Sequence, residues 1–149
     1  MKQLRTLLRL SVDDRRLFAH ALFIVISARL ALPVVEIGRL RRWAARRGMG
    51  DRPVNRVIWA VRAAARRVPG ATCLVSSLAL QRLLSRHGHP SELHIGVAKR
   101  GTEFAAHAWV ICEGEVLDGE GGDDAYTRLI AWRAAEETAG AAGGSANPG

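Results

Sequence analysis

Three residues with the strongest potential for chemistry lie in the second half of the chain, and the first is a cysteine at a predicted helix start. Cys73 directly follows Thr72, which is a natural N-cap. At a helix start the backbone N–H groups and the dipole favour an anion, so a reactive thiolate would be stabilised there. The same N–H groups could hold an oxyanion during acyl transfer, which places Thr72 and Leu74 beside the reacting atoms. The alternative is a small buried cysteine.

His107 and Asp118 are the predicted base and orienting acid, and a hairpin would bring them together. If the strands close symmetrically on Glu113-Gly114, Trp109 faces Asp118. His107 and Asp118 then become diagonal neighbours on one face of the sheet, within side-chain reach. The carboxylate could hold one imidazole nitrogen and leave the other toward the thiol. Trp109, on the same face, would lie near the substrate, but a shift of one residue would turn Asp118 to the other face.

The remaining titratable residues are weaker candidates. Asp123 and Asp124, in a Gly-rich loop, are the alternative orienting acids. Cys112 lies on the strand face opposite the candidate base, so we expect it to pack in the core. His94 could lie either at the surface or in a cleft. His87 flanks a helix end, where a protonated imidazole would complement the dipole. The chain lacks the spacings of common metal and phosphate motifs, so no metal and no cofactor are predicted.

The elements that must position these residues indicate an α+β fold in one compact domain. Apolar spacing predicts helices over 15–32, 34–47, 53–67 and 73–87, the first capped by Asp13 or Asp14. Alternation predicts strands over 92–99, 104–112 and 115–118, and Tyr126–Glu137 is expected to form a last short helix. We divide the domain into a helical N-terminal region (1–68), a catalytic core (69–138) and a disordered small-residue tail (139–149).

Positive charge is concentrated in the first half of the chain. Residues 1–67 carry a net +12 and residues 68–149 a net −4. The basic half could meet nucleic acid, an acidic peptide, anionic lipid or an acidic partner protein, or it could be a solvated surface. Two cysteines and the absence of a signal-peptide pattern predict a cytoplasmic setting. Leu17–Val35 is long enough to span a membrane, but Arg29 and Pro33 within it favour a core helix.

The stretch Pro69–Gly119 resembles the leader-peptidase half of the B protein of lasso peptide biosynthesis, a transglutaminase-like cysteine protease. Its matching pieces are Cys-Leu-x-x-Ser-Leu-Ala-Leu at Cys73–Leu80, His-Gly-x-Pro at His87–Pro90, Leu-x-Ile-Gly-Val at Leu93–Val97, and Ala-His-Ala-Trp-Val at Ala106–Val110. The chain departs from the family pattern at Ser76, where a basic residue is expected. We also expect the stand-alone form, since no room for a leader-binding domain precedes the first helix.

This resemblance implies a papain/transglutaminase-like core in which Cys73, His107 and Asp118 form a Cys-His-Asp triad. It implies a cysteine endopeptidase that removes the leader from a ribosomally synthesised lasso precursor peptide through a thioester acyl-enzyme. The implied partners are the precursor peptide, a small leader-binding protein that delivers it, and an ATP-dependent macrolactam cyclase. No cofactor and no nucleic acid are expected, and membrane association is the less favoured alternative.

Two other functions stay open from the residues alone. A transglutaminase-like acyltransferase would keep the same fold and nucleophile but pass the acyl group to an amine instead of water. A non-catalytic basic module would use the arginine-rich first half to bind nucleic acid, with the strands as scaffold.

Overall fold

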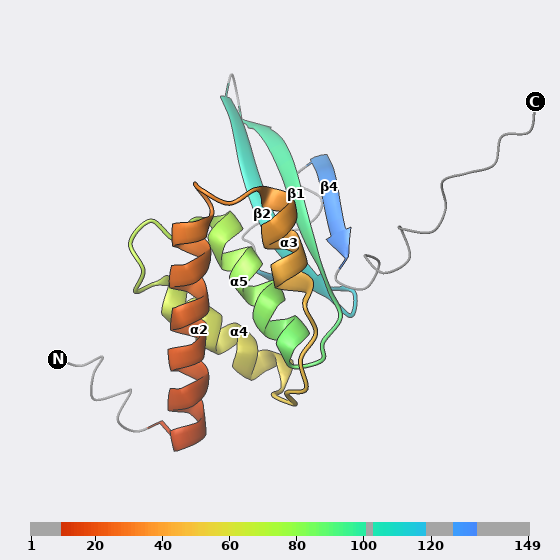
Figure 1. Ribbon diagram of the computed structural model, residues 1–149. Coiled ribbons are helices and arrows are strands. Elements are labelled where there is room, and N and C mark those ends of the chain that lie inside the picture. The colour runs from red at the N-terminus through yellow and green to blue at the C-terminus, as the bar shows by residue number, and fades with distance from the viewer. Residues whose placement is uncertain (1–9, 101–102, 119–126, 134–149) are drawn as a thin grey trace, which may run out of the picture.

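A computed structural model describes residues 10–100, 103–118 and 127–133 of the 149-residue chain, with side chains over 10–97 and 105–117. Within these ranges helices come first and strands follow (Figure 1). The helices are α2 (Val12–Ala31), α3 (Ile37–Ala45), α4 (Val54–Ala65) and α5 (Cys73–Arg86). The strands are β1 (Ser91–Arg100), β2 (Glu103–Cys112), β3 (Glu115–Asp118) and β4 (Thr127–Arg133). The α+β fold class is confirmed.

The strands form one antiparallel sheet in the order β3-β2-β1-β4, and the helices gather on one side of it (Figure 1). Helix α5 is the central element, because it contacts α2, α3 and α4 as well as β1 and β2. Helix α5 therefore lies between the other helices and the sheet.

The core forms around α5, whose leucines are buried on most sides of the helix. Leu78, Leu80, Leu83 and Leu84 each have at most 1% of their surface exposed. Burying one such side chain stabilises the fold by roughly 1.5–3 kcal/mol. The sheet contributes side chains of three strands to the same cluster: Leu93, Val110, Cys112 and Leu117. This continuous core fixes α5 against the sheet.

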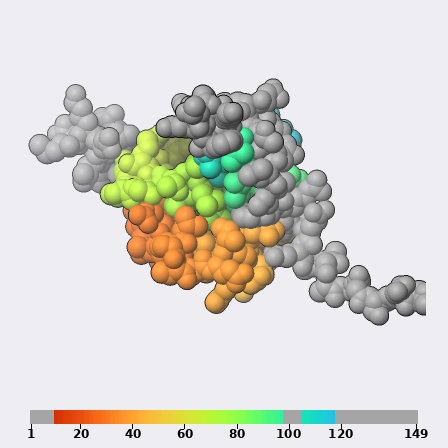
Figure 2. Space-filling view, turned by 90° about the horizontal axis from the view of Figure 1, so that it is seen from above, coloured from red at the N-terminus to blue at the C-terminus, as the bar shows by residue number. Residues whose placement is uncertain are grey.

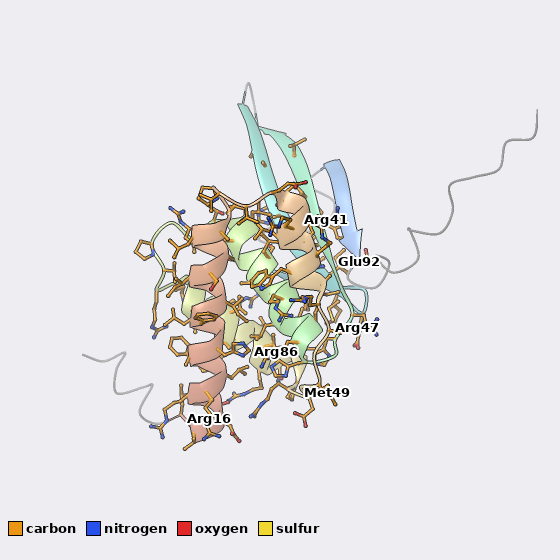
Figure 3. The ribbon with its side chains drawn as sticks, viewed as in Figure 1. Arg16, Arg41, Arg47, Met49, Arg86 and Glu92 are labelled. Carbon is orange, nitrogen blue, oxygen red and sulfur yellow. The ribbon has the colours of Figure 1, made fainter. Side chains whose placement is uncertain are left out.

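The segment after α3 supplies hydrogen bonds to the C-terminal end of α5. The N–H groups of Gly48 and Gly50 donate to the carbonyls of Ser85 (3.1 Å) and Arg86 (3.0 Å). A Cβ atom at Gly50 would lie 2.0 Å from Nδ1 of His87, so only glycine allows this close approach. Figure 3 shows Arg47, Met49 and Arg86 around this end of the helix. The predicted break at residues 48–50 thus has a structural use.

The predicted helix over Tyr126–Glu137 is wrong where the structure describes it, because residues 127–133 form strand β4. This strand pairs antiparallel with β1, placing Ile95 opposite Ile130 and Leu93 opposite Trp132. A free edge of β1 would leave a row of unpaired backbone groups, and β4 covers that edge. The local sequence does not predict this pairing. The β-branched and aromatic residues of the segment are nevertheless compatible with a strand.

The predicted caps are half right. Ser11 caps α2 by accepting a hydrogen bond from the N–H of Asp14 (3.1 Å), so the expectation of Asp13 or Asp14 as the cap is wrong. Both acids lie in the first turn, where their negative charges interact favourably with the positive end of the helix dipole. Thr72 caps α5 as predicted. Helix α3 is shorter than expected, beginning at Ile37 instead of residue 34.

Candidate active site

Cys73 is the first residue of α5 and is half-buried. The Thr72 hydroxyl accepts from the N–H of Val75 (3.4 Å), and the Thr72 carbonyl accepts from the N–H of Ser76 (3.0 Å). These bonds fix the first turn of the helix, whose leading N–H groups have no partner within the helix itself. The thiol thus lies at the positive end of a 14-residue helix, and solvent reaches it. This placement suits a nucleophile.

The two residues beside Cys73 differ in how they could act. The side chain of Thr72 is exposed, and its hydroxyl is used in the cap. Leu74 is partly buried and packs against the main core. Its side chain therefore belongs to the scaffold, and its backbone N–H is the group that could face an oxyanion.

His107 lies in the middle of β2, and its half-buried ring stacks on Trp109. The two ring centroids are 6.0 Å apart with an angle of 15° between the planes. Trp109 also contacts His94 of β1, with centroids 5.6 Å apart, because the strand register places these residues opposite each other. The three rings form a row across the two central strands. This row limits the orientations that the His107 imidazole can take.

His94 belongs to this row and was left undecided by the sequence. It is 1% exposed, and its Nε2 lies 3.0 Å from Oε2 of Glu92. The sequence could have predicted which residue lies opposite His94, because a hairpin centred near Gly101 pairs His94 with Trp109. The sequence could not have predicted the burial of His94, because burial depends on which distant segments cover this face of the sheet.

Strand β2 has two distinct faces. Val110 and Cys112 point into the cluster around α5, as expected from the predicted packing of Cys112. Trp109 is equally buried, at 2% exposed, but it lies outside that cluster. His107 shares the face of Trp109. Cys73 belongs to α5 and His107 to β2, two elements that contact each other, and the proximity of the thiol and the imidazole stays a prediction.

The register near Asp118 differs from the symmetric hairpin. Cys112 pairs with Glu115 and Ile111 with Val116, as predicted. A shift then follows, so that Val110 instead of Trp109 lies opposite Asp118. The predicted pairing is wrong at this pair, because a bulge inserts a residue into one strand, and the symmetric hairpin no longer supports placing Asp118 beside His107. The side chain of Asp118, like Asp123 and Asp124, lies outside the described residues, so its role as orienting acid stays a prediction.

Arg62 of α4 ties β3 to the helical layer directly before Asp118. Its Nη2 donates to the carbonyl of Leu117 (2.6 Å), and the Leu117 side chain is buried in the core. This hydrogen bond holds the end of β3 against α4. No local sequence pattern predicts this contact, which joins residues 55 positions apart.

Electrostatics separate the two cysteines. Burial, with Glu113 and Glu115 beside it, raises the pKa of the Cys112 thiol. A thiol that resists ionisation is a poor nucleophile. Cys73 is the more accessible of the two. Among the residues that the structure describes, no cluster of three or more His, Cys, Asp or Glu could hold a metal ion.

Comparison with known families identifies the superfamily of the chain. A family model described as the transglutaminase-like superfamily matches residues 22–131. The chain belongs to the transglutaminase-like superfamily. No curated protein and no solved structure matches it. The match includes Cys73, His107 and Asp118, and it begins within α2, so it extends over most of the helical layer as well as the sheet.

Membership of this superfamily supports acyl-group chemistry at a cysteine. The superfamily includes cysteine peptidases and acyltransferases, and both begin with attack of a thiolate on a carbonyl carbon. Cys73 at the start of α5 is suited to that step. No described helix has the length and apolar character needed to cross a membrane.

Proposed function

We propose that the protein is a cysteine endopeptidase that removes the leader from a ribosomally synthesised lasso precursor peptide. The observation that carries this proposal is the half-buried Cys73 at the capped start of α5, in a chain of the transglutaminase-like superfamily. The resemblance of Pro69–Gly119 to the lasso leader peptidase narrows the substrate. A small leader-binding protein delivers the precursor, and an ATP-dependent macrolactam cyclase takes up the released core peptide.

In the proposed reaction Cys73 attacks the carbonyl carbon of the scissile bond, and the thiol proton passes to His107. The tetrahedral oxyanion is held by backbone N–H groups at the start of α5, that of Cys73 among them. His107 then gives the proton to the leaving amine, and a thioester joins the leader to Cys73. Water, deprotonated by His107, releases the leader as a free acid. Asp118 holds the imidazole in the required tautomer.

The test compares Cys73→Ala with Cys112→Ala on the precursor peptide, with the leader-binding protein present. We expect Cys73→Ala to abolish cleavage, since no other group can form the thioester. The Cys112→Ala protein should keep most of its activity, because that thiol only packs in the core. Peptide masses are read by mass spectrometry. Cleavage by Cys73→Ala at the wild-type rate would overturn the proposed function.

A transglutaminase-like acyltransferase is the second candidate, since the superfamily also includes acyltransferases. The two reactions share the thioester and differ in the acceptor. Adding a primary amine such as methylamine to the same assay separates them by product mass. Hydrolysis adds one water across the broken bond, whereas transfer attaches the amine to the leader.

A further inference from the structure

The outward face of α2 is apolar where a surface helix is normally polar. Phe23, Ile26 and Leu30 recur at three- and four-residue spacing, which places them on one side of the helix. Phe23 is 69% exposed and Leu30 is 67% exposed, and Val34 follows just after the helix at 80%. The opposite side of α2 is buried through Leu17, Ala21, Ile24, Val25 and Ala28. We refer to Phe23, Ile26, Leu30 and Val34 as the apolar strip.

A hollow of about 280 Å³ lies beside the apolar strip, between α2 and α3. Its lining is mostly apolar and includes Ala31, Leu40 and Trp43, with Arg39 as the charged member. Figure 2 shows α2 and α3 next to each other at the surface. This volume is just below the range of about 300–1,000 Å³ typical of small-molecule pockets, and it suits one or two inserted side chains. A concave site of this kind fits a protein helix better than a flat lipid surface.

Charge decides between the proteins that could cover this surface. Residues 10–47 carry eight arginines and three acidic residues. Two of those acids, Asp13 and Asp14, already pair with Arg52 and Arg56. A second copy of the chain would bring the same positive excess, and like charges across an interface oppose association. An acidic partner would instead gain from the arginines, and Arg39 lies where a carboxylate flanking the hollow would reach it.

We propose that the hollow and the apolar strip dock an amphipathic helix of another protein, with carboxylates flanking its apolar face. In helix-in-groove recognition the bound helix supplies apolar anchors at i, i+3 or i+4, and i+7, and the hollow with the apolar strip beside it would receive them. The partner's anchors would cover Phe23 and Leu30 and fill the hollow beside Trp43. This surface is formed by α2 and α3, so its occupancy can be measured without any peptidase assay.

The experiment selects peptides from a library of 18-residue helical sequences with Glu or Lys at every flanking position. Wild-type protein should enrich peptides with helically spaced apolar residues and a net negative charge. A representative peptide should bind the Phe23→Ser/Leu30→Ser protein at least tenfold more weakly by fluorescence anisotropy. Arg39→Glu, a change at an exposed site, should reverse the preference from Glu to Lys. Val116→Ser, which alters an exposed apolar residue on β3, is the matched control.

Several results would overturn this docking surface. Equal enrichment by wild-type and Phe23→Ser/Leu30→Ser protein would place the peptide elsewhere, and so would a loss of binding in Val116→Ser. Enrichment of apolar peptides without a preference for Glu over Lys would show that the partner need not be acidic, which contradicts the proposal. Vesicles of anionic lipid bound in preference to the peptides, with the same dependence on Phe23 and Leu30, would make the surface a membrane contact. A dimer lost in that double variant, detected by analytical ultracentrifugation, would make a second copy the occupant.

Discussion

At the scale of single residues, the two cysteines show how position determines reactivity. Cys73 is half-buried at a helix start, and Cys112 is buried on the core face of β2. The row of rings formed by His94, Trp109 and His107 shows the same effect of position. Stacking on Trp109 restricts the rotation of the His107 imidazole. The chemistry of the site thus depends on packing around each group as well as on its type.

Alkylation should separate the two thiols in the folded protein. With iodoacetamide at pH 8, we expect Cys73 to be modified and Cys112 to be protected, because burial raises the pKa of the Cys112 thiol and hinders access. Peptide mass spectrometry after brief labelling reads both sites. In urea both cysteines should react alike, which serves as the control. Equal labelling in the folded state would contradict the assigned burial.

At the scale of elements, α5 carries the site because its start is well defined. Thr72 caps it, Cys73 opens it, and buried leucines hold it against three helices and the sheet. Spacing and cap residues were enough to predict its bounds to within one residue, ending at Arg86 instead of His87. Element β4 could not be predicted in the same way, since pairing with a distant strand determines its conformation.

The cap of α5 gives a prediction at this scale. Replacing Thr72 by Ala should lower the free energy of unfolding by about 1 kcal/mol, since the N–H of Val75 loses its acceptor. Urea denaturation followed by circular dichroism measures the change. Thr72→Ser keeps the hydroxyl and should stay close to the wild-type value. A Thr72→Ala protein as stable as Thr72→Ser would mean that the cap contributes nothing.

At the scale of the whole molecule, burial and nearby positive charge both lower histidine pKa values where α2, α5 and the 46–52 segment meet. Burial, followed by the nearby arginines Arg86 and Arg82, lowers the pKa of His20. Burial also lowers the pKa of His87, whose Nδ1 accepts from the N–H of Arg52 (3.4 Å). The lowered pKa disfavours the protonated His87 that was expected to complement the helix dipole, because burial and the neighbouring positive charges oppose protonation.

Stability should consequently fall as the solution becomes mildly acidic. The ordinary histidine pKa of 6.5 applies in the unfolded chain, and the folded-state pKa of both residues is lower. Below about pH 7 the unfolded state thus binds protons first, and the free energy of unfolding decreases until pH passes the folded-state values. Urea denaturation at pH 7.5 and pH 5.5 measures this loss.

His87→Gln supplies the matched variant, because glutamine can still accept a hydrogen bond but does not titrate. Its stability should change less between the two pH values than that of the wild type. Measurements stay above pH 5 because the paired carboxyl of Asp14, whose pKa is lowered by Arg56 and Ser11, titrates only in stronger acid. A pH dependence as large as that of wild type in both His87→Gln and His20→Gln would rule out these histidines as its source.

The sequence by itself determined the α+β class, the four described helices, strands β1 to β3 and the identity of the candidate nucleophile. Those features depend on local rules: apolar period, capping residues and turn residues lie within a few positions of what they control. Tertiary structure alone decided the β4 pairing, the bulge that places Val110 opposite Asp118, and the Arg62 bond to Leu117. It also left the outer face of α2 exposed. Each of these depends on which distant segments meet, and no local pattern encodes that.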